Sequence, residues 1–469
     1  MVFDSYTFLI FLAVMLPAYF LLPWPGGRRL LLLVGSLYFY GAWNPPFTIL
    51  LVGVSAAAWA AAELIDRSRS TFGRRIWLTA GVTTVLTPLL FFKYGAFLWS
   101  NARALGLAAS WYDLPPAMRI TLPVGISFFT FQALSYTCDV YLRRHGRSGS
   151  FLDFLLYIAF FPQLVAGPIV RFHEFAPPLR ELRSFTSATF VAGLKLLIIG
   201  MFQKVVIADG ICAGIADNVF DRMPEPSTPA AWIGTLAFAV QIFCDFAGYS
   251  TAAIGTAAMF GFHLPMNFNA PYGAVGFSDF WRRWHITLSS WLRDYVYIPL
   301  GGSRGGPLAT ARNLMVTMLL GGLWHGAAWT FVVWGGLHGA LLVAQRWAGR
   351  VRRAGERAWG GHALAVLTFL VVCFTWVPFR ARSFESMQVM LCALAGFGHA
   401  GPSLPIQQAV AVVLLAAGTV AWHRFHASGH VIPWTARVPA WAQGLGYGAL
   451  AYALFTAPAQ SRAFIYFQF

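Results

Sequence analysis

The stretch LLGGLWHGAAWTFVVWGGLHGALLVA, residues 319–344, contains two histidines but no Asp, Glu, Lys or Arg. A bilayer core about 30 Å thick needs around 20 predominantly apolar residues per helical span. The rest of the chain has the same character, because 58% of its 469 residues are hydrophobic and only 11% are charged. An ordinary soluble domain carries roughly a quarter charged residues. The sequence therefore predicts an all-α polytopic membrane protein.

Apolar segments recur along the whole chain, and the polar gaps between them are too short to form a soluble domain. We expect about eleven full spans in a single membrane domain covering residues 1–469. The first segment has no basic residue before it and no small-residue cleavage site behind it, which favours a retained span over a signal peptide. Some segments are too short to cross fully and are expected to be re-entrant or tilted. The predicted segments are 6–23, 28–43, 47–65, 76–98, 121–141, 151–170, 187–215, 230–261, 308–323, 326–346, 363–379, 385–398, 405–422 and 441–457.

Prolines and glycines interrupt several of these segments, around Pro123, from Pro162 to Pro168, and from Gly321 to Gly326. Irregular backbone at membrane depth is tolerated only where protein encloses it or where it lines a wet cavity. The interruptions therefore predict an internal cavity.

The formal net charge of +16 is spread over loops and the ends of the predicted spans. No long basic run or nucleic-acid-binding motif is present, so we expect no nucleic-acid partner. Basic residues concentrate in the connections near Arg28, Arg75, Arg144 and Arg353, which the positive-inside rule places on the cytoplasmic side. The five cysteines stand singly, without the spacing of a metal site or a disulfide framework, so neither is expected.

The segment DFWRRWHITLSSWLRDYVYIP, from Asp279 to Pro299, collects charge in a chain that otherwise avoids it. At 100° per residue, its three tryptophans and His285 fall on one face, and Arg282 and Arg293 fall on a second face. This pattern predicts one amphipathic helix in the membrane interface. A simple membrane anchor would explain the arginines, but His285 occupies a position where an anchor helix ordinarily places a hydrophobic residue.

Ionisable side chains inside spans are costly and are therefore functional candidates. Lys204, Asp245, His325 and His338 are such residues. Small residues follow His325, so a substrate or another helix can approach its imidazole closely. Histidine also needs little adjustment of its reference pKa, near 6.5, to accept a proton at neutral pH. A buried structural histidine remains the simpler alternative for both histidines.

Signatures of other enzyme classes are missing: the sequence has no phosphate-binding G-x-x-x-x-G-K-[ST] loop, no H-E-x-x-H and no G-x-S-x-G. The residues alone leave two classes open. One is a membrane acyl or group transferase that works through a buried histidine, and the other is a secondary transporter built on broken helices.

Ordered motifs along most of the chain resemble the membrane-bound O-acyltransferase family, especially its bacterial branch typified by the membrane subunit of alginate O-acetyltransferase. The chain departs from the family pattern at Ser250-Thr251, where relatives have Ser-Asp, and at Pro378, where an aromatic residue is expected. The matching motifs are LPVGISFFTFQALSYTCDVY, FFPQLVAGPIVRFHEF, QIFCDFAGYSTAAIGTAAMFGFHLPMNFNAPY, FWRRWHITLSSWLRDYVYIPLGG, LGGLWHGAAWTFVVWGGLHG and FTWVPFRARSFESM.

The resemblance implies a ring of tilted and re-entrant helices around a central tunnel. It also implies that His325, in the W-H-G motif, is the catalytic base, and that His285, in the W-R-R-W-H motif, is a second catalytic group. Substrate-binding candidates taken from the matching motifs are Arg282, Arg293, Trp281, Trp324, Asp245, Gln163 and Arg171. We expect Arg282 and Arg293 to bind the phosphates of the acyl donor, because a guanidinium group can form paired hydrogen bonds with phosphate oxygens.

The function implied by the resemblance is acetyl transfer in the bacterial inner membrane, without a bound cofactor or metal. Acetyl-CoA on the cytoplasmic side is the expected donor, and alginate or a similar exported exopolysaccharide is the expected final acceptor. A separate periplasmic acetyltransferase is expected to complete the transfer, and membrane lipid is expected to surround the chain. D-alanyl transfer, peptidoglycan acylation and, as a minor alternative, solute transport remain open.

Overall fold

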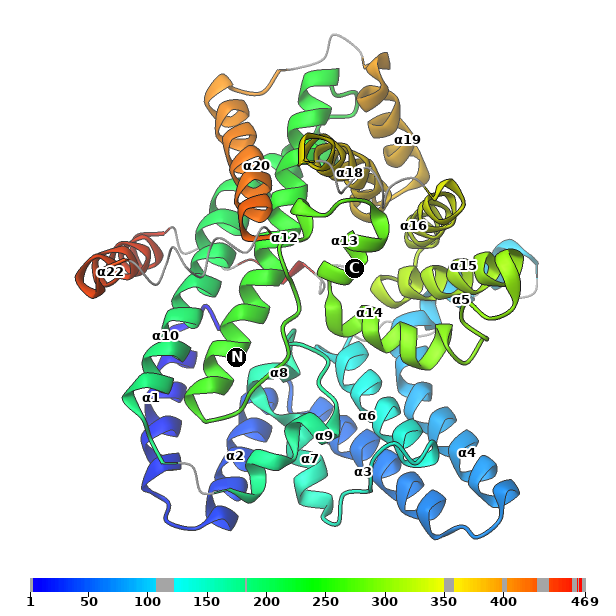
Figure 1. Cartoon of the computed structure of the whole chain (residues 1–469), viewed down its shortest axis with the longest axis vertical. Helices are drawn as coiled ribbons and strands as arrows, with labels where there is room; N and C mark the ends of the chain where they lie inside the picture. Colours follow the sequence, from blue (N-terminus) through cyan, green and yellow to red (C-terminus); the bar gives the residue numbers. More distant parts are fainter. Residues whose placement is uncertain are drawn as a thin grey trace. The chain divides into compact units, whose positions relative to one another are not determined.

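The computed structural model describes residues 3–106, 122–181, 184–349, 358–398, 403–427, 438–457, 462 and 464–465, and these residues contain helices and no strand. The chain divides into two compact units, one formed by Met1–Leu197 with Tyr249–Pro265 and the other by Ile198–Gly248 with Met266–Phe469. Two long helices, α10 (Ser187–Met201) and α12 (Thr228–Met259), belong partly to each unit. Most of the α-helices are labelled in Figure 1.

The first unit is built from helices whose starts are set by local sequence. Ser5, Ser70 and Ser150 cap their helices by accepting a hydrogen bond from a backbone N–H, which satisfies an otherwise unpaired donor. Its elements are α1 (Tyr6–Leu21), α2 (Pro25–Gly41), α3 (Pro45–Arg67), α4 (Thr71–Leu89), η1 (Leu90–Tyr94), α5 (Gly95–Ala104), α6 (Ile126–Tyr141), α7 (Phe151–Ala159), α8 (Phe161–Leu164), α9 (Phe172–Phe175) and η3 (Pro177–Arg180).

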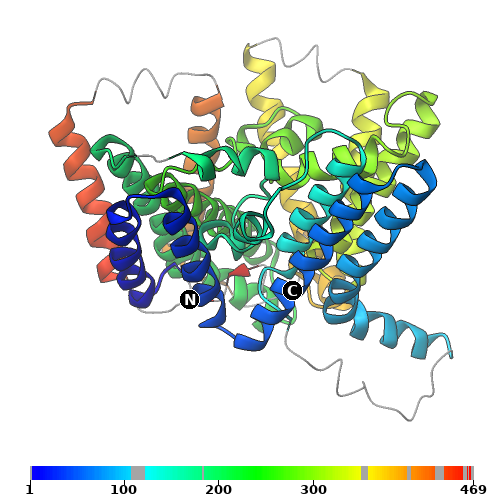
Figure 2. The same ribbon diagram turned by 90° about the horizontal axis from the view of Figure 1, so that it is seen from below.

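Small residues let the helices of this unit pack closely. Helices α3, α4 and α6 lie side by side (Figure 2), and a side chain at Gly81 of α4 would meet the Cβ of Ala61 in α3. Gly125 precedes α6 with a φ of +74°, and a Cβ there would lie 2.5 Å from the carbonyl oxygen of Leu164. Glycine is therefore required at this turn by both conformation and space.

The predicted segment 151–170 is not one continuous helix. Helix α7 ends at Ala159, the short helix α8 follows, and residues 165–171 are buried but not helical. Pro162 occupies the first turn of α8, where its missing N–H costs nothing, and Pro168 cannot supply the hydrogen bond that a continuing helix would need. The interruption predicted from Pro162 to Pro168 is thus confirmed.

The second unit contains the remaining elements, apart from the parts of α10 and α12 that belong to the first. The α10 helix continues without a break through a twelve-residue π-helix, η4, so that residues Ser187–Arg222 form one helical segment. The elements after α10 are η4 (Phe202–Ala213), α11 (Gly214–Asp217), η5 (Asn218–Arg222), α12, η6 (Pro271–Gly273), α13 (Phe277–Arg283), α14 (Ile286–Leu292), η7 (Arg293–Tyr297), α15 (Gly306–His325), α16 (Trp329–Ala348), α18 (Ala358–Arg380), α19 (Phe384–Cys392), η8 (Ala393–Phe397), α20 (Ile406–Ala427) and α22 (Ala440–Thr456).

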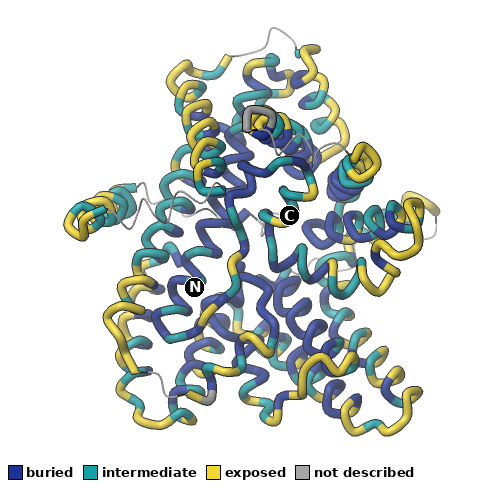
Figure 3. The backbone as a smooth tube through the Cα atoms, in the orientation of Figure 1, coloured by how far each residue is buried: buried dark blue, intermediate teal, exposed yellow. Residues whose placement is uncertain are grey.

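Burial separates helices that are enclosed by protein from those that face outward. The window that qualifies α12 as a span is 83% buried, whereas that of α20 is 17% buried (Figure 3). By length and composition, six helices of the described chain can cross a membrane. The multi-pass, all-α prediction is confirmed, whereas the count of about eleven spans, the single domain and the ring around a tunnel remain predictions.

Candidate functional site

His325 is the last residue of α15, at the turn of a close helical hairpin formed by α15 and α16. The hairpin is tight because Gly322 of α15 faces Gly335 of α16, and an added Cβ on either glycine would collide with backbone of the other helix. The helix continues through Gly321 and Gly322 and breaks at Gly326, whose φ is −156°. The predicted interruption therefore occurs immediately after His325.

Aromatic rings enclose the imidazole of His325, which is only 2% exposed. The ring centroids of Trp324 and Trp334 each lie 5.0 Å from that of His325, and the ring of Phe379 lies at 5.2 Å. All three contacts are edge-on, and α15, α16 and α18 contribute one ring each. This environment keeps bulk water away from the imidazole and fixes its orientation.

His285 interrupts the segment that was predicted to be one amphipathic helix, so that prediction is wrong. Helix α13 ends at Arg283, helix α14 begins at Ile286, and His285 has a φ of +43°, in the left-handed region. Asn267 makes this break possible, because its backbone carbonyl accepts a hydrogen bond from the N–H of Ile286 at 2.9 Å. The break turns His285 inward, where it is fully buried.

The side chain of Asn267 also fixes the tautomer of His285. Its Oδ1 accepts from the backbone N–H of Thr287 at 3.4 Å and lies 3.0 Å from Nδ1 of His285. Because the Thr287 N–H can only donate, the atom it meets must be an acceptor, and Nδ1 of His285 must then carry a proton. In the neutral imidazole, Nε2 is consequently the basic nitrogen.

The two histidines share one cluster of rings. Their centroids lie 6.3 Å apart, and Trp324 contacts both, at 5.5 Å from His285. Phe246 of α12 packs edge-on against His285 at 4.6 Å. The structure thus brings together His325, His285 and Trp324, three of the residues singled out from the sequence.

His338 and Trp281 form a neighbouring pair. The indole N–H of Trp281 lies 3.3 Å from Nδ1 of His338, which must accept because an indole nitrogen can only donate. Trp334 separates this pair from the catalytic candidate, since its ring lies 4.8 Å from His338 and 5.0 Å from His325. In this structure His338 holds Trp281 in place.

Arg282 and Arg293 point their guanidinium groups outward, with side chains 70% and 62% exposed. Each pairs with a nearby carboxylate, Arg282 with Asp279 at 3.4 Å and Arg293 with Asp294 at 2.8 Å. Exposed pairs of this kind contribute little to stability, typically about 0–1 kcal/mol. Both arginines are therefore accessible to an anionic ligand, and their donor-binding role remains a prediction.

Asp245 and Lys204 form a buried ion cluster with Asp209. The Nζ atom of Lys204 lies 2.7 Å from a carboxylate oxygen of Asp245 and 2.9 Å from one of Asp209. Lys204 and Asp209 share a face because they lie in the π-helix η4, where the repeating hydrogen bond joins residues five apart. Each carboxylate is thus paired with the one ammonium group within the fold, which offsets part of the cost of burying these charges.

The same cluster holds the chain segment near residue 465. The carbonyl of Arg462 accepts from Lys204 at 3.2 Å, and the second carboxylate oxygen of Asp245 accepts from the N–H of Ile465 at 2.8 Å. Phe464 then packs on Phe246, the ring that contacts His285. This arrangement favours a positioning role for Asp245 over direct contact with substrate.

Gln163 and Arg171 belong to the first unit. The side-chain amide of Gln163 donates to the carbonyl of Tyr157 at 2.6 Å, and the backbone N–H of Arg171 donates to Glu174 at 3.2 Å. Both residues are buried and stabilise the irregular segment around α8 and α9. Their substrate-binding role stays a prediction.

The first unit also contains a group with metal-ligand chemistry that the sequence reasoning missed. Potential ligand atoms of Asp139, His145 and His173 all lie within 4.8 Å of one another, and the two imidazoles stack with centroids 3.7 Å apart. Arg144 lies 3.5 Å from the carboxylate of Asp139 and competes for it. The expectation of no metal therefore remains a prediction.

The sequence reasoning also missed Asn267, Phe246, Trp334 and Phe379, although each lies in a motif quoted above. Asn267 offered a usable signal, since an amide in the short segment between two apolar elements often bonds to backbone. The aromatic residues offered none, because a buried ring against a histidine has the same sequence pattern as any core residue.

The chain is similar to several known proteins. A family model described as the membrane-bound O-acyltransferase family matches residues 70–388. The chain is 40% identical over 406 residues to the "Probable alginate O-acetylase AlgI" of Azotobacter vinelandii, covering 85% of this chain and 79% of that protein. A protein of the same name from Pseudomonas aeruginosa is 40% identical over 405 residues, with 85% and 75% covered. The "Peptidoglycan O-acetyltransferase" of Helicobacter pylori is 36% identical over 394 residues, with 78% and 74% covered.

Proposed function

The chain belongs to the membrane-bound O-acyltransferase family, and we propose that it transfers acetyl groups for the O-acetylation of an exported polysaccharide, alginate or a similar exopolysaccharide. One observation supports the choice of acetyl as the transferred group and of an exopolysaccharide as the acceptor. Two proteins named as alginate O-acetylases are 40% identical to the chain over 85% of its length. As a multi-pass membrane enzyme it is expected in the inner membrane, where a cytoplasmic donor and an exported acceptor are both within reach.

Acetyl-CoA is the proposed donor, and a hydroxyl group is the immediate acceptor. The hydroxyl oxygen attacks the thioester carbonyl carbon while His325 removes the hydroxyl proton. The carbon–sulfur bond then breaks, and the coenzyme A thiolate leaves and takes up that proton. General base catalysis of this kind typically contributes about 10²–10⁴-fold to the rate.

His285 supports this step through its basic Nε2 atom, because Nδ1 is committed to Asn267. In the neutral tautomer Nε2 can accept a hydrogen bond from the attacking hydroxyl or from the proton that His325 has received. The enclosing rings of Trp324, Trp334 and Phe379 strengthen such interactions by excluding water. Arg282 and Arg293, with exposed guanidinium groups, are proposed to bind the phosphates of the donor.

A separate periplasmic acetyltransferase is proposed to pass the acetyl group to the polymer, and a serine or threonine of that partner could be the immediate hydroxyl acceptor. A histidine-bound acetyl intermediate is the less favoured route. Radiolabel that stays on the purified wild-type chain and is lost in His325→Ala would reverse this preference.

Peptidoglycan is a second candidate acceptor, supported by the 36% identity to the Helicobacter pylori peptidoglycan O-acetyltransferase. The deciding experiment deletes the gene and measures ester-linked groups on both exported polysaccharide and peptidoglycan, with and without the wild-type gene restored. The proposal predicts that acetyl ester disappears from the exported polysaccharide and returns on complementation. Loss of acetyl ester from peptidoglycan alone would show that peptidoglycan is the acceptor. Loss of D-alanyl ester instead of acetyl ester would contradict acetyl transfer.

A further inference from the structure

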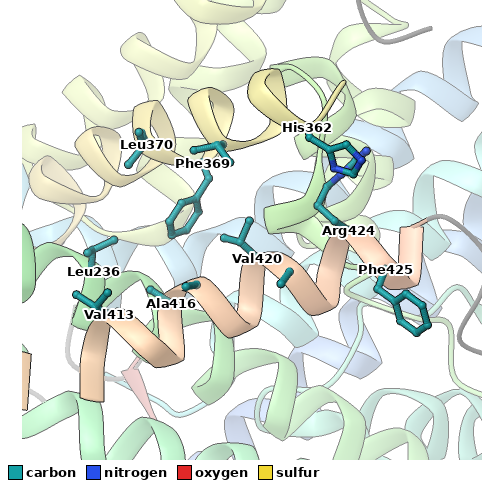
Figure 4. A pocket seen from close by; sticks show the side chains of 12 residues that line it. Leu236, His362, Phe369, Leu370, Val413, Ala416, Val420, Arg424 and Phe425 are labelled. Carbon is teal, nitrogen blue, oxygen red and sulfur yellow. The ribbon is translucent and has the colours of Figure 1, made fainter. Parts of the chain in front are cut away.

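A groove of about 900 Å³ lies between α18 and α20, and Leu236 of α12 lines it near Val413 (Figure 4). Its walls are apolar and include Phe369, Val413 and Val420. Val413 is 46% exposed, so the groove opens to the outside of the unit. In a membrane protein, such an opening on a spanning helix faces lipid.

One end of the groove carries the polar side chains of Arg424 and His362 (Figure 4). Within the described residues one hydrogen bond anchors Arg424, from a terminal nitrogen to the carbonyl of Gly273 at 3.0 Å. Its Nε atom is buried and has no hydrogen-bond partner among the described residues. No carboxylate in the described part of the chain forms an ion pair with Arg424. The guanidinium group therefore retains donors for an anion.

The dimensions of the groove match one leaflet of a bilayer. Val413 and Arg424 are eleven residues apart on α20, which corresponds to roughly 16 Å along a helix. Half of a bilayer core about 30 Å thick is about 15 Å. An acyl chain lying along the apolar walls would thus place its headgroup beside Arg424.

Charge and position both favour a lipid of the cytoplasmic leaflet. Arg424 lies in the last turn of α20, and His362 lies near the start of α18, directly after the basic sequence 350–357. Basic residues at the ends of spans mark the cytoplasmic side. Basic pockets between spans on that side bind the headgroups of anionic lipids.

We propose that this groove binds one anionic phospholipid, with an acyl chain along α20 and its phosphate on Arg424 and His362. The bound lipid stabilises the contact between α20 and η6, where Nδ1 of His423 accepts from the N–H of Tyr272 at 3.1 Å. The ring of Tyr272 stacks on that of Trp284, the residue before His285. The lipid therefore supports the segment between α13 and α14 that contains His285.

The test titrates delipidated full-length protein with phosphatidylglycerol or with phosphatidylcholine of the same chain length, and follows binding by native mass spectrometry. Phosphatidylglycerol is expected to bind more tightly. Arg424→Gln should weaken it at least about tenfold, because the variant loses the charged hydrogen-bond donors that face the phosphate. Arg346→Gln, at the exposed end of α16, is the matched control and should change nothing.

Ala417→Trp fills the apolar part of the groove and leaves the hydrogen bond between Arg424 and Gly273 in place. It should abolish retention of phosphatidylglycerol, and it carries the test if Arg424→Gln does not fold. Unchanged binding in Ala417→Trp or in Arg424→Gln would overturn the proposal. Competition by inorganic phosphate at equal concentration would also overturn it, because the site would then bind phosphate without a lipid chain.

Discussion

Replacing Lys204 with methionine would leave the carboxylates of Asp209 and Asp245 buried without the cation that they share. The side chains of all three residues are at most 6% exposed, and the Nζ–oxygen distances are 2.7 and 2.9 Å. Removing one partner of a buried ion pair typically costs about 3–5 kcal/mol, because the remaining charge is neither solvated nor paired. We expect a loss of this size in the free energy of unfolding of Lys204→Met.

The assay measures unfolding of purified protein in mixed micelles with increasing denaturing detergent, followed by the fluorescence of the buried tryptophans. The triple variant Lys204→Met/Asp209→Asn/Asp245→Asn is the matched control. It removes every charge of the cluster, and the amide at position 245 can still accept a hydrogen bond from the N–H of Ile465. Its free energy of unfolding should therefore recover most of what Lys204→Met loses. If the free energy of unfolding of Lys204→Met lies within about 1 kcal/mol of the wild-type value, the reasoning is refuted, because a buried and unpaired charge should destabilise the fold by more than that.

Three further changes test the surroundings of the histidines. Asn267→Ala removes the acceptor that fixes Nδ1 of His285, and should lower stability by about 1–3 kcal/mol in the same unfolding assay and reduce acetyl transfer. If neither the stability nor the rate of acetyl transfer changed, the tautomer of His285 would have to be fixed by another group. Arg282→Ala and Arg293→Ala, measured separately, should raise KM for acetyl-CoA with little change in kcat. An unaltered KM in both variants would contradict the phosphate-binding role of these arginines. Gly335→Leu should prevent α15 and α16 from meeting and should reduce folded protein in the membrane, whereas normal levels would show that the hairpin tolerates separation.

The sequence was sufficient to predict most helices because each apolar segment has a length and a hydrophobicity that the bilayer constrains. The segment predicted at 363–379, for example, falls within α18, and the one at 405–422 falls within α20 except for its first residue. At 151–170 the break was indicated by Pro162 and Pro168 and not by hydrophobicity, since the buried irregular backbone there is as apolar as a helix would be. Hydrophobicity alone therefore cannot distinguish the two.

Within the site, His325 was predictable from its position beside small residues and from the family motif, whereas its aromatic enclosure was not. The break at His285 depends on Asn267, which is eighteen residues away in sequence, and helical periodicity contains no information about such a partner. Likewise, the charges of Lys204 and Asp245 were visible, but their pairing required the fold. Long-range contacts thus decide whether an ionisable residue is catalytic or structural.

The necessity of His325 is best tested with two buried histidines compared in parallel. Deletion cells that contain the partner proteins are complemented with wild type, His325→Ala or His338→Ala at matched membrane levels. The initial rate of transfer of radiolabelled acetyl groups from acetyl-CoA to polysaccharide is then measured in their membranes. His338 is the control because it is equally buried and contacts the same Trp334. We predict that His325→Ala lowers the rate by at least about 10²-fold, as expected for loss of a general base, and that His338→Ala retains most of it. A wild-type rate in His325→Ala would contradict the proposed mechanism and make His325 a structural residue.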